Sequence, residues 1–299
     1  FIVIQHLAPD YKSMMVELLS KRTAMTVLRA EDGLMVEPNT VYLIPPKKNL
    51  TIFHGKLLLS DQEPVRGINL PIDVFLQSLA EDQGDKAVAV ILSGTGSDGM
   101  RGVRAIKESG GMVMVQDETT AKFDGMPRAA LSTGLADFVL PPADMPRQLL
   151  AWHKHPYASK AERSETLRTD DDRMARIFAM LRTRTKVDFT YYKPATVVRR
   201  IERRMTVTQT RDLSDYVTYL ESHPGELSVL YRELLIGVTS FLRDPAAWDR
   251  LENDVLPELL KRDTGRQVRM WVAGCSTGEE AYSLAILCRE VQEKLGTEV

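Results

Sequence analysis

A histidine and an aspartate follow two apolar segments that are predicted to be strands. His6 comes just after Phe1–Ile4, and Asp98 follows Ala87–Leu92 in a loop that contains three glycines. Because the carboxyl ends of parallel strands meet at one crevice of an open sheet, these two side chains can lie side by side. A histidine that is oriented by a carboxylate is the base half of a nucleophilic triad, since the carboxylate fixes the tautomer and stabilises the imidazolium.

Both residues also have a structural interpretation, which the pattern leaves open. A single histidine after a strand is often a hydrogen-bonded structural residue. An aspartate in a glycine-rich loop is often the N-cap of the next helix, here the predicted helix Gly99–Ser109.

A second group of chemically notable residues is the basic segment Lys193–Met205, which has five basic residues and one acidic residue. Its arginines are spaced to line the exposed side of a helix in two pairs four residues apart: Arg199 with Arg203, and Arg200 with Arg204. Like charges at this spacing repel each other by about 0.2–0.5 kcal/mol, so the stripe suggests an anionic partner, although a solvated face would look the same. Aromatic residues for base stacking are not interleaved with the arginines, which favours an acidic protein surface over nucleic acid.

The third group is the segment Trp271–Glu280, where a predicted strand, Gln267–Ala273, meets a predicted helix, Gly278–Leu295. A glycine turn at this place, around Gly274, lets a nucleotide-like ligand approach the backbone at a helix N-terminus, although a simple turn fits equally well. The acids Glu279 and Glu280 would repel phosphates and suit a cationic ligand, or they could serve only as partners of the helix dipole.

Composition limits the classes of protein that remain. The chain has 299 residues, 43% of them hydrophobic, and a net charge of −2, which excludes wholesale disorder and a globally basic nucleic-acid binder. Its two cysteines, Cys275 and Cys288, exclude a disulfide scaffold and are expected to be reduced, buried thiols of a cytoplasmic protein. No apolar run approaches the ~20 residues of a membrane span. The start at Phe1, inside an apolar run, and the end at Val299 predict an interior piece of a longer protein.

The order of predicted elements gives an α/β domain, a small all-α domain and the start of a second α/β domain. The first, residues 1–154, alternates short apolar strands with helices and predicts a mainly parallel sheet, with an exposed hairpin at Leu50–Ser60. Residues 155–172 are charged and poor in large apolar side chains, which predicts a linker. Residues 173–240 are helical throughout, and residues 241–299 predict a helix, a strand, a glycine turn and a helix, the opening of a Rossmann-like fold. The elements expected in the first domain are the strands Phe1–Ile4, Val41–Ile44, Ala87–Leu92, Met112–Val115 and Asp137–Leu140, and the helices Tyr11–Arg22, Pro71–Asp82, Gly99–Ser109 and Ala143–His153.

Four stretches of the first domain resemble the chemotaxis protein-glutamate methylesterases of the CheB type. They are FIVIQHLAPDY, VYLIPP, ILSGTGSDGMRG and FDGMPRAA. The resemblance implies that His6 is the triad base, that Asp98 orients it, and that Thr95 stands in the oxyanion-side loop where other members carry Met. The nucleophilic serine of that family lies upstream of the histidine, outside these residues, so this piece alone should not hydrolyse a methyl ester. Phe123–Arg128 is expected either to shape the wall of the site or to serve core packing.

The remainder of the chain resembles the chemotaxis receptor methyltransferases of the CheR type, through VDFTYYKPATVVRRIERRM, GVTSFLRD and VAGCSTGEEAYSLA. The resemblance implies that the basic helix, with Arg199, Arg200, Arg203 and Arg204, docks on acidic receptor helices. It also implies an S-adenosylmethionine site to which Thr239, Arg243, Gly274, Glu279 and Glu280 contribute, with Arg243 on the carboxylate of the cofactor. Where the family has Asn, this chain has Gly237, which removes an amide contact, and the acid that binds the ribose would lie beyond Val299.

These observations predict a fused chemotaxis-type receptor-modifying protein of the cytoplasm. One half would hydrolyse glutamate methyl esters and the other would form them from S-adenosylmethionine, each half being incomplete in this piece. The expected partners are chemotaxis receptors, with no nucleic acid, no membrane insertion and no metal, since His153 and His155 lack a third ligand. Two alternatives remain open: a serine hydrolase of another substrate class, and a non-enzymatic signalling adaptor that docks through its basic helix.

Overall fold

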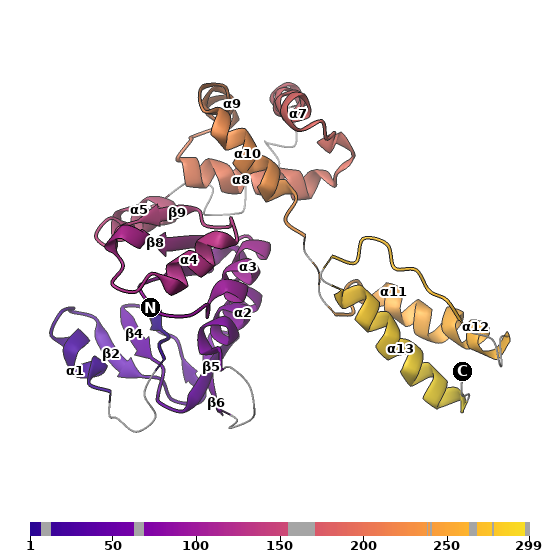
Figure 1. Cartoon of the computed structure of the whole chain (residues 1–299), viewed down its shortest axis with the longest axis horizontal. Coiled ribbons are helices and arrows are strands. Elements are labelled where there is room, and N and C mark those ends of the chain that lie inside the picture. The colour runs from indigo at the N-terminus through magenta and orange to yellow at the C-terminus, as the bar shows by residue number, and fades with distance from the viewer. Residues whose placement is uncertain are drawn as a thin grey trace. The chain divides into compact units, whose positions relative to one another are not determined.

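The computed structural model describes residues 1–6, 13–62, 69–154, 171–237, 239, 241–262, 268–276 and 278–296. The chain divides into two compact units, Phe1–Ile236 and Gly237–Val299, which are described separately here (Figure 1). Most of the predicted linker, 155–170, lies outside the described residues.

Parallel strands form the centre of the first domain. Strand β4 (Thr40–Leu43) lies between β1 (Ile2–Val3) and β2 (Thr26–Arg29), and both pairings are parallel. In a second sheet, β8 (Met112–Gln116) pairs in parallel with β7 (Val88–Ile91) on one side and β9 (Phe138–Leu140) on the other. Every residue of β4 and β8 is buried, as expected of strands that are covered on both faces. The predicted α/β class is confirmed.

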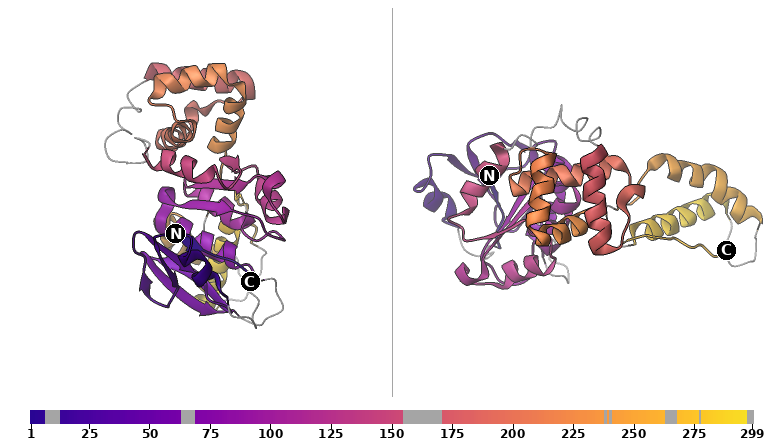
Figure 2. Two further views of the ribbon diagram at one scale, coloured as in Figure 1. Left: turned by 90° about the vertical axis from the view of Figure 1, so that its left-hand side faces the viewer. Right: turned by 90° about the horizontal axis from the view of Figure 1, so that it is seen from above.

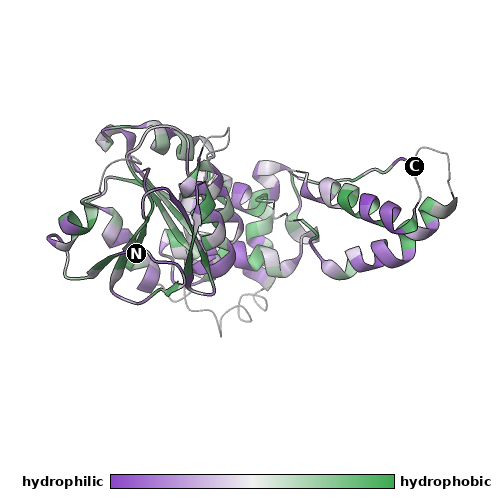
Figure 3. Ribbon diagram, turned by 90° about the horizontal axis from the view of Figure 1, so that it is seen from below, coloured by the Kyte–Doolittle hydropathy of each residue, from purple (hydrophilic) through white to green (hydrophobic). Residues whose placement is uncertain are grey.

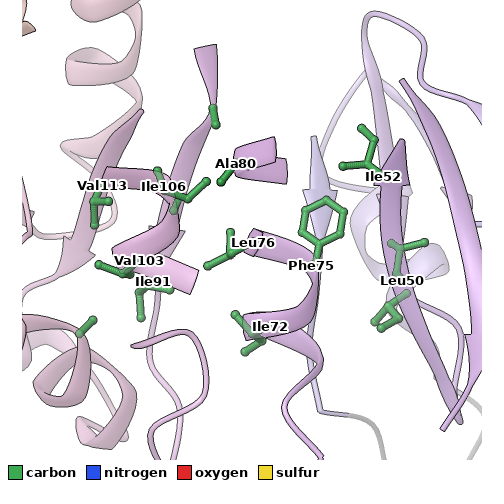
Figure 4. Packing of buried hydrophobic residues seen from close by; sticks show 14 of the residues in the cluster. Leu50, Ile52, Ile72, Phe75, Leu76, Ala80, Ile91, Val103, Ile106 and Val113 are labelled. Atoms are coloured by element: carbon green, nitrogen blue, oxygen red, sulfur yellow. The ribbon is translucent and has the colours of Figure 1, made fainter. Parts of the chain in front are cut away.

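Helix α2 (Pro71–Gln83) occupies the middle of the core. Its proline stands in the first turn, where the missing N–H costs nothing. Figure 4 shows Phe75 and Leu76 of this helix between the side chains of the hairpin strands and those of β7 and α3 (Met100–Glu108). The remaining helical segments of the domain are α1 (Met15–Ser20), α4 (Gly125–Ser132), α5 (Met145–Lys154) and the short 3₁₀ turns Gly84–Lys86 and Glu118–Thr120.

The hairpin is not exposed as predicted. Strands β5 (Lys48–Phe53) and β6 (Lys56–Asp61) pair antiparallel and are joined by a third strand, β3 (Leu34–Met35). Leu50 and Leu57 are completely buried in the main core. The expectation was wrong because one face of the hairpin packs on the apolar side of α2. A hairpin alone in water would be only marginally stable, and this packing stabilises it.

Residues Asp171 to Leu234 form the predicted all-α domain. Its helices are α7 (Asp171–Thr185), α8 (Pro194–Thr208), α9 (Leu213–Ser222) and α10 (Pro224–Leu234), with a 3₁₀ turn at Phe189–Tyr191. They enclose a core of their own, in which Leu181, Ile201, Tyr216 and Leu230 are fully buried (Figure 2).

The second unit is helical where it is described. Helices α11 (Pro245–Arg250) and α12 (Leu256–Arg262) are joined by a π-helical turn, Leu251–Val255, and they pack against α13 (Glu279–Leu295). Residues 268–273 form no strand, contrary to the prediction, and Gln267 lies outside the described residues. A strand needs a neighbour to satisfy its backbone, and the described residues of this unit provide no second strand.

Two further expectations can be compared with the structure. Cys275 and Cys288 are free thiols but half-buried, not buried: Cys275 lies in the turn before α13, and Cys288 lies on α13 itself. Among the described residues, none of the helices has the length and apolar character needed to cross a bilayer. Hydropathy colouring shows apolar strands in the first domain and helices with alternating polar and apolar surfaces elsewhere (Figure 3).

Candidate active site

His6 and Asp98 meet, although 92 residues separate them in the chain. The His6 Nε2 atom lies 2.8 Å from the Asp98 Oδ2 atom. His6 follows β1 and Asp98 follows β7, so the ends of strands from the two sheets bring them together. The histidine side chain is 50% exposed whereas the aspartate side chain is 3% exposed. The imidazole is therefore open to solvent on one side and fixed by a buried carboxylate on the other.

The Asp98 carboxylate is held by the first turn of α2. Its Oδ2 atom accepts the N–H of Ile72 at 3.0 Å, and its Oδ1 atom accepts the N–H of Asp73 at 2.9 Å. These N–H groups have no partner within the helix, and the positive end of the helix dipole favours the ionised carboxylate. Asp98 therefore does cap a helix, but it caps α2 and not the helix that follows it in sequence.

This arrangement determines which nitrogen of His6 can act as a base. An ionised carboxylate only accepts hydrogen bonds, so the hydrogen-bond network assigns the proton to Nε2. The lone pair is then on Nδ1, the nitrogen that can take a proton from a hydroxyl group. The pair has the geometry of an oriented general base.

The loop that carries Asp98 packs against residues Phe123–Arg128. The Ser93 Oγ atom accepts the N–H of Phe123 at 2.9 Å, and Gly94 exchanges backbone hydrogen bonds with Phe123 and Met126, each 2.9 Å long. A Cβ atom at Gly94 would come within 2.3 Å of the Met126 sulfur, so a larger residue there would require the Met126 side chain to move. Met126 also belongs to the core. The expected packing role of the segment is therefore confirmed, whereas its role as a wall of the site stays a prediction; Thr95 is exposed.

The arginines of α8 do not form the exposed stripe that the sequence predicted. Arg200, Arg203 and Arg204 are 1%, 8% and 5% exposed, and Arg199 is half-buried. The expectation of an exposed stripe was wrong because carboxylates from distant parts of the chain, Asp137, Glu226 and Glu233, lie against this face.

The charges in this cluster shift each other's protonation. Burial lowers the pKa of Arg200 to about 10. Burial alone would raise the pKa of Asp137, but Arg203 and Lys107 outweigh it and hold that pKa well below its ordinary value. Arg204 is paired inside the helical domain, where its Nε and Nη2 atoms donate to Glu226 at 2.7 and 2.8 Å.

In the second unit, the two segments predicted to bind a cofactor lie together. The Leu242 N–H donates to Ser283 Oγ at 2.9 Å, and this hydroxyl donates to the Glu279 carbonyl at 2.7 Å. Leu242 is thereby held at the start of α13; the adjacent Arg243 is exposed, and Thr239 is half-buried.

The turn before α13 is suited to a ligand with cationic groups. Gly274 and Gly278 have φ values of +69° and +107°, and a Cβ atom at Gly274 would meet nothing within 4 Å. Glu279 is half-buried and Glu280 exposed in the first helical turn, while Thr277 lies outside the described residues. Open backbone next to two carboxylates fits the amino group and sulfonium of S-adenosylmethionine.

Three family models match successive parts of the chain. Residues 1–149 match the family described as CheB methylesterase. Residues 172–235 match the CheR methyltransferase all-alpha domain, and residues 237–298 match the CheR methyltransferase SAM binding domain.

Similar proteins contain these segments in longer chains. An uncharacterized 104.1 kDa protein in the hypE 3' region of Rhodobacter capsulatus is 40% identical over 304 residues, covering 94% of this chain and 32% of that protein. The protein-glutamate methylesterase FrzG of Myxococcus xanthus is 36% identical over 149 residues, covering 50% of this chain and 45% of that protein. The crystal structure of the Thermotoga maritima CheB methylesterase catalytic domain is 34% identical, covers 50% of this chain and 81% of that chain, and has a TM-score of 0.46. The chain therefore spans between a third and a half of the length of these two curated relatives.

The fold and the site define an α/β domain with parallel strands and an oriented histidine–aspartate pair at its strand ends. The chain belongs to the CheB methylesterase family through residues 1–149 and continues into the helical domain and the first part of the SAM binding domain of CheR methyltransferases.

Proposed function

We propose that the protein to which this chain belongs removes and adds methyl groups on glutamates of chemotaxis receptors. The observation that carries the first half is the His6–Asp98 contact at 2.8 Å, with the carboxylate fixed by two backbone N–H groups. The names of relatives support the substrate: FrzG is a protein-glutamate methylesterase, and the similar protein of Moorella thermoacetica is a protein-glutamate methylesterase/protein-glutamine glutaminase.

In the proposed hydrolysis, His6 takes a proton at Nδ1 from a serine hydroxyl as its oxygen attacks the ester carbonyl. Asp98 stabilises the resulting imidazolium without taking the proton itself. The imidazolium then protonates the departing methanol, and water releases the glutamate by the same route. By the family resemblance, the serine would stand upstream of His6. Ser93 is a poor candidate, because its hydroxyl already contacts the backbone of Phe123 as acceptor at 2.9 Å and donor at 3.2 Å.

The second half of the proposal is methyl transfer from S-adenosylmethionine to a receptor glutamate. Arg243 would bind the carboxylate of the cofactor, Glu280 its amino group, and Gly274 would let it approach the backbone, with Thr239 and Glu279 beside them. The cofactor supplies an electrophilic methyl group. A glutamate carboxylate is already ionised at pH 7, so the chain needs to provide position and exclusion of water and not a general base.

The proposal is tested with a chain that also includes the sequence upstream of residue 1. Release of methanol from a methylated receptor fragment is measured for the unchanged chain and for His6→Gln. We expect a loss of about 10³–10⁴-fold. Asp144→Asn serves as a control, because the Asp144 carboxylate lies at the surface and forms a long ion pair, at 3.8 Å, with the exposed Arg147. Hydrolysis of simple esters without methanol release would indicate a different substrate class, and no hydrolysis at all would support the adaptor.

A further inference from the structure

Two arginines of α8 donate to backbone carbonyls around the C-terminus of α3, the helix that begins just after Asp98: Arg200 to the last turn of the helix and Arg203 to the glycines that follow it. Arg200 donates from Nη1 to the carbonyl of Lys107 at 3.0 Å. Arg203 donates from Nη2 to the carbonyl of Gly111 at 2.7 Å. The last carbonyls of a helix lack partners and carry the negative end of its dipole, so cationic side chains are favourable there.

Each of the two domains contributes both a cation and a carboxylate to the ion pairs between them. Lys107 of the first domain forms an ion pair with Glu233 of the helical domain, at 2.9 Å. Arg203 of the helical domain forms an ion pair with Asp137 of the first domain. Lys107 and Asp137 also pair with each other at 2.8 Å, as do Arg203 and Glu233. All four side chains are at most 7% exposed. These contacts, together with those of Arg200, are called the ionic joint.

We propose that the surface formed by Arg200 and Arg203 has two mutually exclusive partners: the Asp137 side of this chain and the acidic helix of a receptor-like protein. The inference rests on the proposed function, methylation of receptor glutamates, together with the docking on acidic helices that the CheR-type resemblance implies for the basic helix. In the arrangement described here the chain occupies its own docking surface.

Burial makes the two partners exclusive. Guanidinium groups that are 1% and 8% exposed have no free side for a carboxylate from outside. An external helix can reach them only after Asp137 and the end of α3 have moved away. Arg204 takes a smaller part in this exchange: it lies 3.6 Å from Asp137, but its closer partner, Glu226 at 2.7 Å, is in the same domain and stays with it.

The composition of the joint makes it separable. It consists of ion pairs and of hydrogen bonds to carbonyls, and water can replace these interactions when the surfaces part, whereas a lost apolar interface has no such replacement. The two sides belong to one chain, so closure is intramolecular and competes at a high effective concentration. An external ligand then binds with an affinity reduced by the fraction of open molecules.

The test uses the full chain of 299 residues and a helical peptide of about 20 residues with glutamates four apart, long enough to fold in water. A peptide with glutamine in place of glutamate is the comparison. Binding is measured by fluorescence anisotropy for the unchanged chain, for Asp137→Asn and for the matched control Asp144→Asn. Asparagine can still accept the Val113 N–H, which Asp137 accepts at 2.9 Å, but it lacks the charge that holds Arg203. We expect Asp137→Asn to bind the glutamate peptide about tenfold more tightly than the other two, and the glutamine peptide no better.

A second variant covers the case in which Asp137→Asn does not fold. Lys107→Met removes two ion pairs of the joint but leaves Asp137 and Glu233 each paired with Arg203. We therefore expect this variant also to bind the glutamate peptide more tightly than the unchanged chain, but by a smaller factor than Asp137→Asn. Hydrogen exchange of residues 194–208 reports opening independently of the peptide. Equal binding by all variants would overturn the exclusion while leaving docking intact. Faster exchange without any gain in peptide binding would overturn the proposal by showing that docking itself is absent.

Discussion

Asp73 and Asp98 form a reciprocal pair of helix caps: Asp98 caps α2, whose first turn contains Asp73, and Asp73 caps α3, which begins just after Asp98. Asp98, just before α3, accepts the N–H groups of Ile72 and Asp73 at the start of α2. Asp73, in the first turn of α2, accepts the N–H of Gly102 in α3 at 2.7 Å. The two helices are thus joined at their N-termini by a reciprocal pair of buried carboxylates, and the candidate base His6 depends on one of them.

The first prediction concerns Asp98→Asn. The amide can accept one of the two N–H groups but can present an N–H to His6, which favours the wrong tautomer. In a chain that includes the upstream serine, methyl ester hydrolysis should fall by about 10⁴-fold. The nitrogen chemical shifts of His6 check the cause in the 299-residue chain: Nε2 should carry the proton in the unchanged protein and lose that preference in the variant.

The second prediction concerns pH. Burial, and then repulsion by Asp98, raise the pKa of Asp73 above its ordinary value of 3.8. The folded state therefore holds this proton more tightly than the unfolded state, and the stabilisation is complete below about pH 4 and is lost as the pH rises through the raised pKa. Asp73→Asn cannot titrate. As the pH rises from about 4 to 7, the unfolding free energy of the unchanged chain should therefore fall relative to that of the variant.

Urea unfolding at several pH values measures this difference. A constant difference across the range would show that Asp73 titrates at its ordinary pKa. The control is Asp82→Asn, because Asp82 accepts the Gly55 N–H at 3.2 Å near the surface, away from the carboxylate pair.

The third prediction separates two arginines of the joint. Arg203→Met would leave Asp137 and Glu233 with only part of their counter-charge, and breaking a buried pair in this way costs about 3–5 kcal/mol. Arg200→Met removes the cation whose pKa burial has lowered to about 10 and loses two hydrogen bonds to carbonyls, so a cost of about 1 kcal/mol is expected.

Thermal unfolding followed by circular dichroism should therefore show a much larger drop in Tm for Arg203→Met than for Arg200→Met. Equal drops would mean that the carboxylates find other partners when Arg203 is lost.

Local signals were sufficient for most of the fold. Apolar runs such as 112–115 predicted the central strands, and the proline at position 71 marked the start of a helix. Strand β2 was missed because only Val27 of its four residues is buried, so neither a continuous nor an alternating apolar pattern marks it. Helix α4 was missed because it starts with glycine and has a proline in its first turn.

Local signals could not place the arginines. The stripe on α8 has the same spacing whether it faces solvent, a partner or another domain. Its carboxylate partner Asp137 lies 66 residues from Arg203, and Lys107 lies 93 residues from Arg200. Only the tertiary fold decides that these groups meet. By contrast, His6 and Asp98 each follow a parallel strand, so the rule that functional groups gather at strand ends could predict a contact over 92 residues, although the two strands belong to separate sheets and not to one.

The fourth prediction concerns Gly237, where CheR-type proteins are expected to carry Asn. A Cβ atom at this position would lie 3.1 Å from the Ser276 hydroxyl oxygen, so the new side chain must displace that hydroxyl slightly. In a chain that includes the rest of the methyltransferase domain, Gly237→Asn should tighten S-adenosylhomocysteine binding about three- to tenfold, as one added hydrogen bond would. Calorimetric titration measures the change. Ser276→Gly, which suits the φ of 53° at that residue and removes the hydroxyl, is the companion variant. If Gly237→Asn weakens binding and the double variant restores it, the Ser276 hydroxyl is the obstacle; if neither variant alters binding, position 237 does not face the cofactor.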